Sequence, residues 1–176
     1  VTWSIAPNLP TGLSIDAATG TISGTPNILS TVTTYTVTAT NSGGSDTITI
    51  DITVNDVIPS ISYSGSPFTE TKGQSMAPEA PTKSGGAVIT WSVSPSLPNG
   101  LTLSATTGVI SGTPTVVSST ATYTISATNS GGTGTTTVEI TVNDIPPTNL
   151  AYSPSTLTLT KGELMTSVMP TSSGGA

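Results

Sequence analysis

The chain contains the same stretch of sequence twice, and this duplication constrains its fold more than any other feature. A Thr-Trp-Ser run, a Leu-Pro-x-Gly-Leu turn and an Ile-Ser-Gly-Thr-Pro motif occur in this order at residues 2–26 and again at residues 90–114. The two copies lie 88 residues apart, which is the separation of Trp3 and Trp91. Self-similarity at a fixed period is typical of repeat proteins, in which each repeat is one structural unit. A period of this length is sufficient for one small sandwich domain.

The repeat does not begin where the chain begins. The segment Pro-Thr-Lys-Ser-Gly-Gly-Ala at 81–87 recurs with one change at 170–176. We therefore expect residues 1–56 to form a repeat without its opening strands, 57–145 a complete repeat, and 146–176 the opening strands of a third. Because the length of 176 is two periods, we interpret the sequence as a stretch of a longer tandem chain. The alternative is a unit that joins its neighbours non-covalently by donating strands.

Strand signals dominate both copies. Residues 47–54 and 135–142 alternate β-branched apolar residues with polar ones, a pattern that predicts half-buried strands. Each follows another alternating run across an Asn-Ser-Gly-Gly sequence, at 41–44 and 129–132, which predicts a β-hairpin. No segment shows helical periodicity with caps. The sequence therefore predicts an all-β fold of tandem antiparallel β-sandwiches.

Proline residues follow the strongest strand of each copy. Asn-Asp-Val-Ile-Pro occupies 55–59, and Asn-Asp-Ile-Pro-Pro occupies 143–147. Because proline restricts the backbone, these joints are expected to be stiff. We predict that the repeats form a semi-rigid rod or filament.

The composition excludes several functional classes. Charged residues make up 7% of the chain, with three lysines, no histidine, no cysteine and a formal net charge of −6. Nucleic-acid binding needs a basic surface, so no nucleic-acid partner is expected. No apolar run is long enough to span a membrane, so this segment is not expected to insert into one. Without cysteine, a sandwich of this kind is more typical of a bacterial surface protein than of a eukaryotic secreted one.

The Leu-Pro-x-Gly-Leu turn, followed by Thr-Gly-x-Ile-x-Gly-Thr-Pro, resembles the signature of the He_PIG (putative Ig) family. That family is related to the dystroglycan-type, cadherin-like domains. The resemblance implies tandem Ig-like sandwiches in large, secreted or surface-attached, mostly bacterial proteins. The same pattern occurs in both copies, and each is followed by a Tyr-x-(Ile/Val)-x-Ala-Thr-Asn sequence. The matching positions are 97–101, 107–108, 110 and 112–114 in one copy, and 9–13, 19–20, 22 and 24–26 in the other.

Two functions follow from this resemblance. The first is a structural repeat, a spacer or stalk in a long extracellular or cell-surface fibre or adhesin, assembled head to tail into a filament. Its partners are neighbouring copies of the same repeat, and any glycan or host ligand binds elsewhere in the full protein. The alternative is an adhesive module that recognises a glycan or a protein through its loops. The Asn-Ser-Gly-Gly loops are short and identical in both copies, which favours the spacer.

No catalytic or cofactor-binding residue is predicted, and the chain is not expected to be an enzyme, because histidine and cysteine are absent. Calcium at the joints is a weaker hypothesis, with Asn55, Asp56, Asn143 and Asp144 as candidate ligands. Calcium takes six to eight oxygen ligands, so each joint would need further carboxylates. The alternative is that these side chains cap turns by bonding nearby backbone. The further carboxylates would have to come from Asp16, Glu70, Glu79 or Glu163.

Two other side-chain types have a functional and a structural interpretation. Trp3 and Trp91 could stack on sugars, but an Ig-like sandwich contains a buried tryptophan, so we expect both in the core. Lys72 and Asn143 could form an isopeptide crosslink. The catalytic acid for such a bond has no clear candidate, so we expect Lys72 to be a solvated turn residue.

Overall fold

The computed structural model describes residues 1–174 of the chain, and over this range it consists of strands, turns and loops without a helix. The predicted all-β class is therefore confirmed. No helix in the described range could cross a membrane. The chain packs into two compact units, one made of Val1–Ser60, Ser84–Ile89 and Thr128–Gly134, the other of Ile61–Lys83, Thr90–Ala127 and Thr135–Ala176. The domain limits at 56/57 and 145/146 stay a prediction.

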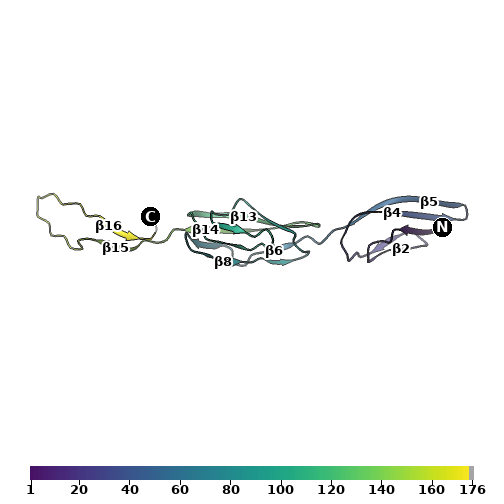
Figure 1. Cartoon of the computed structure of the whole chain (residues 1–176), viewed down its shortest axis with the longest axis horizontal. Helices are drawn as coiled ribbons and strands as arrows, with labels where there is room; N and C mark the ends of the chain where they lie inside the picture. Colours follow the sequence, from purple (N-terminus) through teal and green to yellow (C-terminus); the bar gives the residue numbers. More distant parts are fainter. Residues whose placement is uncertain (175–176) are drawn as a thin grey trace. The chain divides into compact units, whose positions relative to one another are not determined.

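The first copy of the repeat forms two small sheets. Strands β1 (Thr2–Ala6), β4 (Ser30–Asn41) and β5 (Gly44–Val54) make an antiparallel sheet with β4 in the middle. Strands β2 (Leu13–Ile15) and β3 (Ile22–Gly24) make a two-stranded hairpin. The alternating runs read from the sequence correspond to β4 and β5, which lie side by side in Figure 1 and pair from Asn41↔Gly44 outward.

The second copy has the same strands with one more strand in each sheet. Its larger sheet has the order β10-β13-β14-β7, its smaller sheet has the order β11-β12-β8, and β6 pairs with β9. Figure 1 shows β13 and β14 along one side of this body and β6 and β8 along the other. The strands are β6 (Ser60–Ser62), β7 (Phe68–Thr71), β8 (Met76–Glu79), β9 (Thr82–Ser84), β10 (Thr90–Ser94), β11 (Leu101–Leu103), β12 (Ile110–Gly112), β13 (Ser118–Asn129) and β14 (Gly132–Asn143).

One pairing departs from the antiparallel pattern. Strand β7 runs parallel to the end of β14, with Phe68 opposite Ile140 and Thr71 opposite Asn143. A turn at Lys72 and Gly73 separates β7 from β8. After this turn, β8 pairs with β12 in the other sheet. The opening segment of the repeat therefore adds one edge strand to each of the two sheets.

The core of the second copy lies between these sheets. Strand β14 alternates buried Val138, Ile140 and Val142 with exposed or half-buried residues, as its sequence predicted. Ile110 and Ile125 are fully enclosed. Opening-strand residues of the same body complete the core from its other side: Ile61, Tyr63, Phe68 and Met76.

The last described segment belongs to a further opening-strand sequence. Strands β15 (Thr148–Tyr152) and β16 (Pro170–Ser173) form an antiparallel pair. All residues of both strands are exposed. This segment therefore has the strand pairing of β6 and β9 without a core beneath it.

Candidate functional site

The Asn-Ser-Gly-Gly loop of the second copy is the most specific polar site in the chain. It joins β13 to β14 and presents Asn129 at the end of a long hairpin. The Asn129 Nδ2 donates a hydrogen bond to the carbonyl oxygen of Val57 at 2.7 Å. The Gly131 N–H donates to Asn129 Oδ1 at 2.8 Å. Asn129 is 7% exposed and is the one buried polar residue among those described. Its Nδ2 holds the joint segment, and its Oδ1 holds the loop itself.

Close backbone contact completes this arrangement, which we call the joint socket (residues 129–132). The N–H of Asp56 donates to Ser130 Oγ at 3.1 Å. A Cβ added at Gly131 would lie 1.9 Å from the carbonyl oxygen of Asp56, so only glycine allows this approach. From the loop between β9 and β10, the backbone N–H of Gly86 donates to the same Val57 carbonyl oxygen at 3.1 Å. The joint socket therefore recognises an extended backbone segment and needs no charged group to do so.

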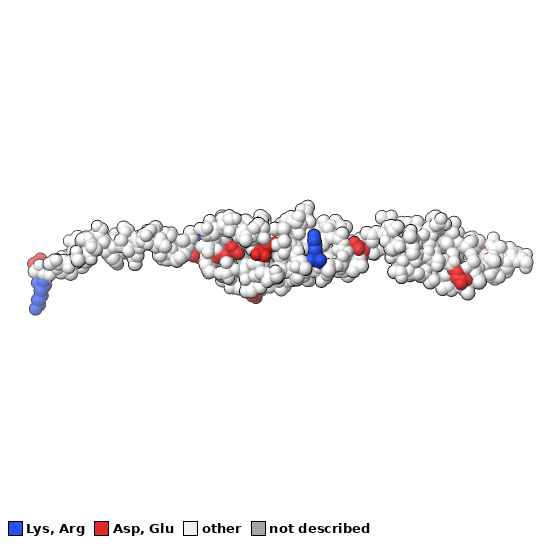
Figure 2. Space-filling model, turned by 90° about the horizontal axis from the view of Figure 1, so that it is seen from below, with Lys and Arg blue, Asp and Glu red and all other residues white. Residues whose placement is uncertain are grey.

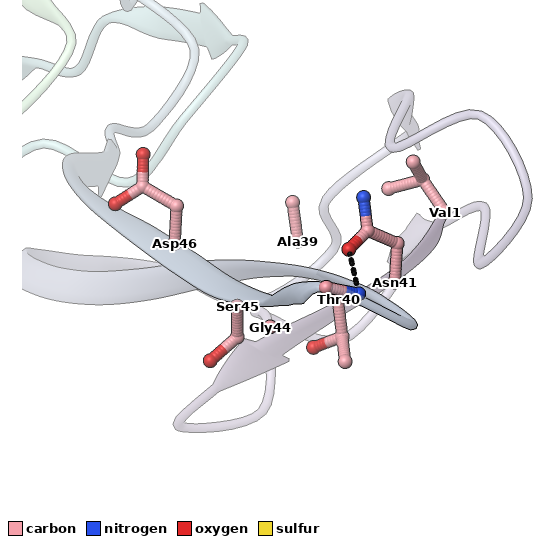
Figure 3. Close-up of a pocket in the computed structure, with 8 residues that line it drawn as sticks. Val1, Ala39, Thr40, Asn41, Gly44, Ser45 and Asp46 are labelled. Atoms are coloured by element: carbon pink, nitrogen blue, oxygen red, sulfur yellow. Dashed lines mark hydrogen bonds between the residues drawn. The ribbon is translucent and has the colours of Figure 1, made fainter.

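The matching loop of the first copy has the same sequence, and its side-chain hydrogen bond within residues 1–174 is internal to the loop. Asn41 is exposed, and its Oδ1 accepts the Gly43 N–H at 2.8 Å, as Asn129 does with Gly131. Figure 3 shows this bond beside a hollow of about 400 Å³ lined by Val1, Ala39 and Thr40 together with the loop. We call residues 41–44 the free socket. It corresponds to the joint socket of the second copy.

The four candidate calcium ligands lie at the two joints. Asp56 Oδ1 accepts the Val57 N–H at 2.8 Å, and Asp144 Oδ1 accepts the Ile145 N–H at 2.9 Å. Asn55 and Asn143 are exposed. Within residues 1–174 there is no cluster of three or more acidic, histidine or cysteine side chains. Each aspartate bonds the backbone N–H of the next residue, and calcium binding at the joints stays a prediction.

Lys72 lies next to the second joint. Its N–H donates to the carbonyl oxygen of Asn143 at 2.9 Å, and its Nζ is 3.9 Å from Asp144 Oδ1. Both side chains of this ion pair are partly exposed, so it contributes less than about 1 kcal/mol to stability. A positive charge at this distance also disfavours a cation beside Asp144. The lysine has the partly solvated position expected for a turn residue rather than the buried one that crosslink chemistry needs.

Of the other carboxylates, Asp16 lies in a turn of the first copy and Glu70 lies beside the second joint. Asp16 caps its own turn by accepting the N–H groups of Ala18 and Thr19 at 2.8 and 2.9 Å. The bond from the Thr19 N–H has the largest effect and that from the Ala18 N–H the next, and they hold the pKa of Asp16 below its usual value. Glu70 lies on β7 opposite Val142, one step from Asn143 in the register. Figure 2 shows the charged side chains as separate spots on an otherwise uncharged face.

The tryptophans face the core, as an Ig-like sandwich predicts. Trp91 is 5% exposed and packs against Gly108, where an added Cβ would lie 2.7 Å from the ring. Trp3 occupies the equivalent position against Gly20 but is only half-buried. A sugar needs an accessible ring face to stack on, and Trp91 offers none.

Tyr63 fixes the opening strands to the same turn. Its hydroxyl donates to the carbonyl oxygen of Gly108, directly beside the Trp91 ring. Burial raises the pKa of Tyr63 to about 12. This tyrosine therefore links the opening segment of the repeat to the turn at Gly108 through one buried hydrogen bond.

Sequence reasoning predicted the Asn-Ser-Gly-Gly turns but not what Asn129 binds. The available signal was the identity of the four residues in both copies, because a hairpin turn alone would accept other Asn-Gly or Gly-Gly sequences. The structure adds the reason for the asparagine and for the first glycine. Asn129 bonds the carbonyl oxygen of Val57, and Gly131 leaves room for the close approach of the Asp56 backbone.

Comparisons with known proteins agree with this architecture. A protein named serine-rich adhesin for platelets, from Staphylococcus aureus, is 37% identical over 148 residues, which cover 78% of this chain and 6% of the relative. The protein of the same name from strain MRSA252 is 36% identical over 147 residues, covering 78% of this chain and 10% of that protein. The chain therefore spans a small part of the length of the curated relatives it matches.

Structural similarity supports the Ig-like fold. Extracellular domains 3–5 of Drosophila OTK superpose with a TM-score of 0.50 and 21% sequence identity, over 80% of this chain and 50% of that one. At this identity the likeness concerns the fold alone. The model of the putative Ig domain family (He_PIG) matches residues 1–55 and 58–143, one match for each copy of the repeat. The chain belongs to the He_PIG family of Ig-like domains, and its curated relatives are adhesins.

Proposed function

We propose that this chain is a structural repeat, a spacer in the stalk of a bacterial cell-surface adhesin, with copies joined head to tail outside the cell. The adhesin relatives and the family membership support the general assignment. The small share of each relative that the chain covers is what a repeated module within a long protein would give. In this proposal the partners are neighbouring repeats, and ligand recognition belongs to other parts of the protein.

One observation favours a spacer over a binding module. In Ig-like domains, ligands are commonly bound by loops at the ends of the sandwich. The Asn-Ser-Gly-Gly loop of the second copy is such a loop, and its polar groups are bonded to the chain's own joint at Val57 and Asp56. A loop committed to the joint is not available to an external ligand. Its identity in both copies fits a role in joining repeats.

The proposal includes no catalysis and no cofactor. The sequence has neither histidine nor cysteine, and the carboxylates described above are dispersed and engaged with local backbone or with Lys72. The carbohydrate alternative lacks an accessible tryptophan ring at Trp91. These features leave the joining of repeats as the role that most of the specific contacts serve.

A surface-display experiment tests the spacer. Arrays of one, two and four copies of the whole chain would be placed between a membrane anchor and a terminal epitope tag, and the height of the tag above the cell surface measured by super-resolution microscopy. The longest strands have 12 residues, so at ~3.3 Å per residue each 88-residue period should add about 40 Å. Flexible Gly/Ser linkers of equal length are the control, because their height grows only with the square root of length.

Linear growth of the tag height with copy number would support the spacer. Growth no greater than that of the Gly/Ser controls would refute it. The adhesive alternative is tested in parallel by probing the immobilised chain with a glycan panel and with platelet surface proteins. Saturable binding that survives in a single copy would replace the spacer with a binding module.

A further inference from the structure

The turn between β10 and β11 in the second copy contains a chemically reactive dipeptide, Asn99-Gly100. It is the one Asn-Gly sequence in the chain. The turn is closed by the Leu101 N–H, which donates to the carbonyl oxygen of Pro98 at 2.9 Å. In an Asn-Gly sequence the backbone nitrogen of glycine can reach the asparagine Cγ, because glycine has no side chain to obstruct the approach. The side-chain amide of Asn99 therefore has a potential nucleophile one residue away.

The fold requires the glycine of this dipeptide but not the asparagine. Gly100 has a φ of +93°, and an added Cβ would lie 2.0 Å from the carbonyl oxygen of Thr113. A side chain at Gly12, the equivalent position of the first copy, is excluded in the same way. The preceding residue differs between the copies, since it is Thr11 in the first and Asn99 in the second. The first copy thus has the matching turn without the reactive amide.

Both reacting groups are free in the folded chain. Asn99 is exposed, and its side-chain amide has no hydrogen-bond partner within residues 1–174. The Gly100 N–H has no acceptor among the same residues. Asn129, which precedes a serine, has the opposite arrangement: it is 7% exposed, and both polar atoms of its amide are bonded. The fold therefore leaves the Asn99 amide open to reaction and shields that of Asn129.

The main-chain carbonyl of Asn99, in contrast, is held by two donors. The Thr115 N–H donates to its oxygen at 2.8 Å, and the Thr115 hydroxyl donates to the same oxygen at 3.2 Å. Donors aimed at one carbonyl oxygen stabilise the negative charge that develops there when the carbonyl carbon is attacked. Thr115 therefore favours attack by water at this carbonyl over attack at a carbonyl without such donors.

We propose that Asn99-Gly100 is a site of spontaneous deamidation and that Thr115 directs the product toward isoaspartate. The Gly100 nitrogen loses its proton to solvent base and attacks Asn99 Cγ. The bond from Cγ to Nδ2 breaks, and the amide nitrogen takes a proton from water and leaves as ammonia, so that a cyclic succinimide remains. Water then adds at the carbonyl carbon held by Thr115, and the bond from this carbon to the Gly100 nitrogen breaks. The main chain now continues through Cγ, and the former main-chain carbonyl is a free carboxylate.

The product retains contacts that the turn already makes. A carboxylate oxygen stays beside the two donors of Thr115, and hydrogen bonds to an ionised acceptor are stronger than those to a neutral carbonyl. The formal net charge changes from −6 to −7, because a carboxylate replaces a neutral amide. The backbone of this turn also gains one methylene group. The reaction goes beyond the proposed spacer function and does not rest on it.

Incubation of the folded chain from neutral to mildly alkaline pH tests the first step. Peptide mapping by mass spectrometry should show conversion at Asn99 at a rate proportional to hydroxide concentration, because the attacking nitrogen must be deprotonated. Incubation in heavy-oxygen water should label the product, which separates it from material converted earlier. Asn129 should keep its amide in the folded chain and react only when urea unfolds the protein. The Asn99→Thr variant, which has the residue of the first copy at this turn, should show no conversion there.

The ratio of isoaspartyl to aspartyl product tests the role of Thr115. Electron-based fragmentation in the mass spectrometer distinguishes these two isomers. The ratio should be about two- to tenfold higher in the folded chain than in urea, which is the effect of one hydrogen bond. Thr115→Val removes the hydroxyl donor at an exposed position, so the ratio should fall toward its value in urea. Thr113→Val is the matched control: this residue is also exposed, its hydroxyl does not bond Asn99, and the ratio should not change.

Two results would overturn the inference. Retention of the Asn99 amide in the folded chain, over a time in which it reacts in urea, would show that the turn prevents the reaction. An equal product ratio in the folded chain, in urea and in the Thr115→Val variant would show that Thr115 does not direct the opening of the ring. The height measurement with arrays tests the spacer separately, and neither result would change its outcome.

Discussion

Replacing Asn129 by alanine tests whether the joint socket holds the joint. The substitution removes the bond from Nδ2 to the Val57 carbonyl at 2.7 Å and the bond from the Gly131 N–H to Oδ1 at 2.8 Å. Asn41 provides a matched control within the same molecule, because it has the same loop sequence and the same local bond to Gly43 but is exposed and has no bond to a joint segment among residues 1–174.

The magnitude follows from burial. A buried hydrogen bond contributes about 1 kcal/mol, and a buried donor left unsatisfied costs about 1–3 kcal/mol. After Asn129→Ala, the Val57 carbonyl keeps its bond from Gly86, whereas the Gly131 N–H loses its acceptor. The expected loss is therefore about 2–3 kcal/mol. At exposed Asn41, water replaces the lost acceptor, so the loss should stay under about 1 kcal/mol.

Amide hydrogen exchange measured peptide by peptide with mass spectrometry resolves the two copies in one sample. Exchange rates report local opening free energies, and about 1.4 kcal/mol corresponds to tenfold. Asn129→Ala should accelerate exchange in β13 and β14 by about 30- to 150-fold. Asn41→Ala should accelerate exchange in β4 and β5 by less than about 5-fold. Equal acceleration by the two substitutions would refute the argument, because the joint would then contribute nothing to the stability of the loop.

Three further predictions concern packing and pH. Gly131→Ala should release the joint and speed exchange at residues 56–58, whereas Gly43→Ala, where an added Cβ meets only the Asn41 side chain at 3.3 Å, should be tolerated. Ile140→Ala should destabilise the second copy by about 2–5 kcal/mol in urea unfolding, and Ile52→Ala should cost the first copy less, because Ile52 is only half-buried. The pKa of Tyr63 is raised to about 12 from an ordinary value of ~10, so its folded state favours the neutral phenol. Its contribution to stability should be complete below about pH 10 and lost as the pH rises through about 12, a dependence that Tyr63→Phe should remove from urea unfolding measured against pH.

The strands were predictable because their information is local. In β14, alternation of Val138, Ile140 and Val142 with polar residues specifies which side faces the core, whatever lies against it. The hairpin turns were equally local, since Asn and Gly adopt the backbone conformations of tight turns. Such patterns gave the all-β class and the paired hairpins without any tertiary information.

The partners of each strand depend on residues far away in the sequence, so they could not be predicted from local patterns. The parallel pairing of β7 with β14 depends on a chain reversal at Lys72 and Gly73, which sends the next strand to the other sheet. The role of Asn129 depends on the approach of a carbonyl 72 positions earlier in the chain. Neither relation leaves a periodic trace in the sequence, and only the identity of the two loops pointed to the second.

The chemistry of the joint socket suits a chain with few charges. Its contacts run between a side-chain amide, a hydroxyl and backbone groups, none of which ionises near neutral pH. Salt screens interactions between exposed charges but has little effect on buried neutral hydrogen bonds. A joint clamped by calcium would instead need several carboxylates at one place, and Asp56 and Asp144 each bond the next residue's backbone. The contacts of the joint socket therefore depend on the fit of the joint backbone against Gly131, and calcium binding at the joints stays a prediction.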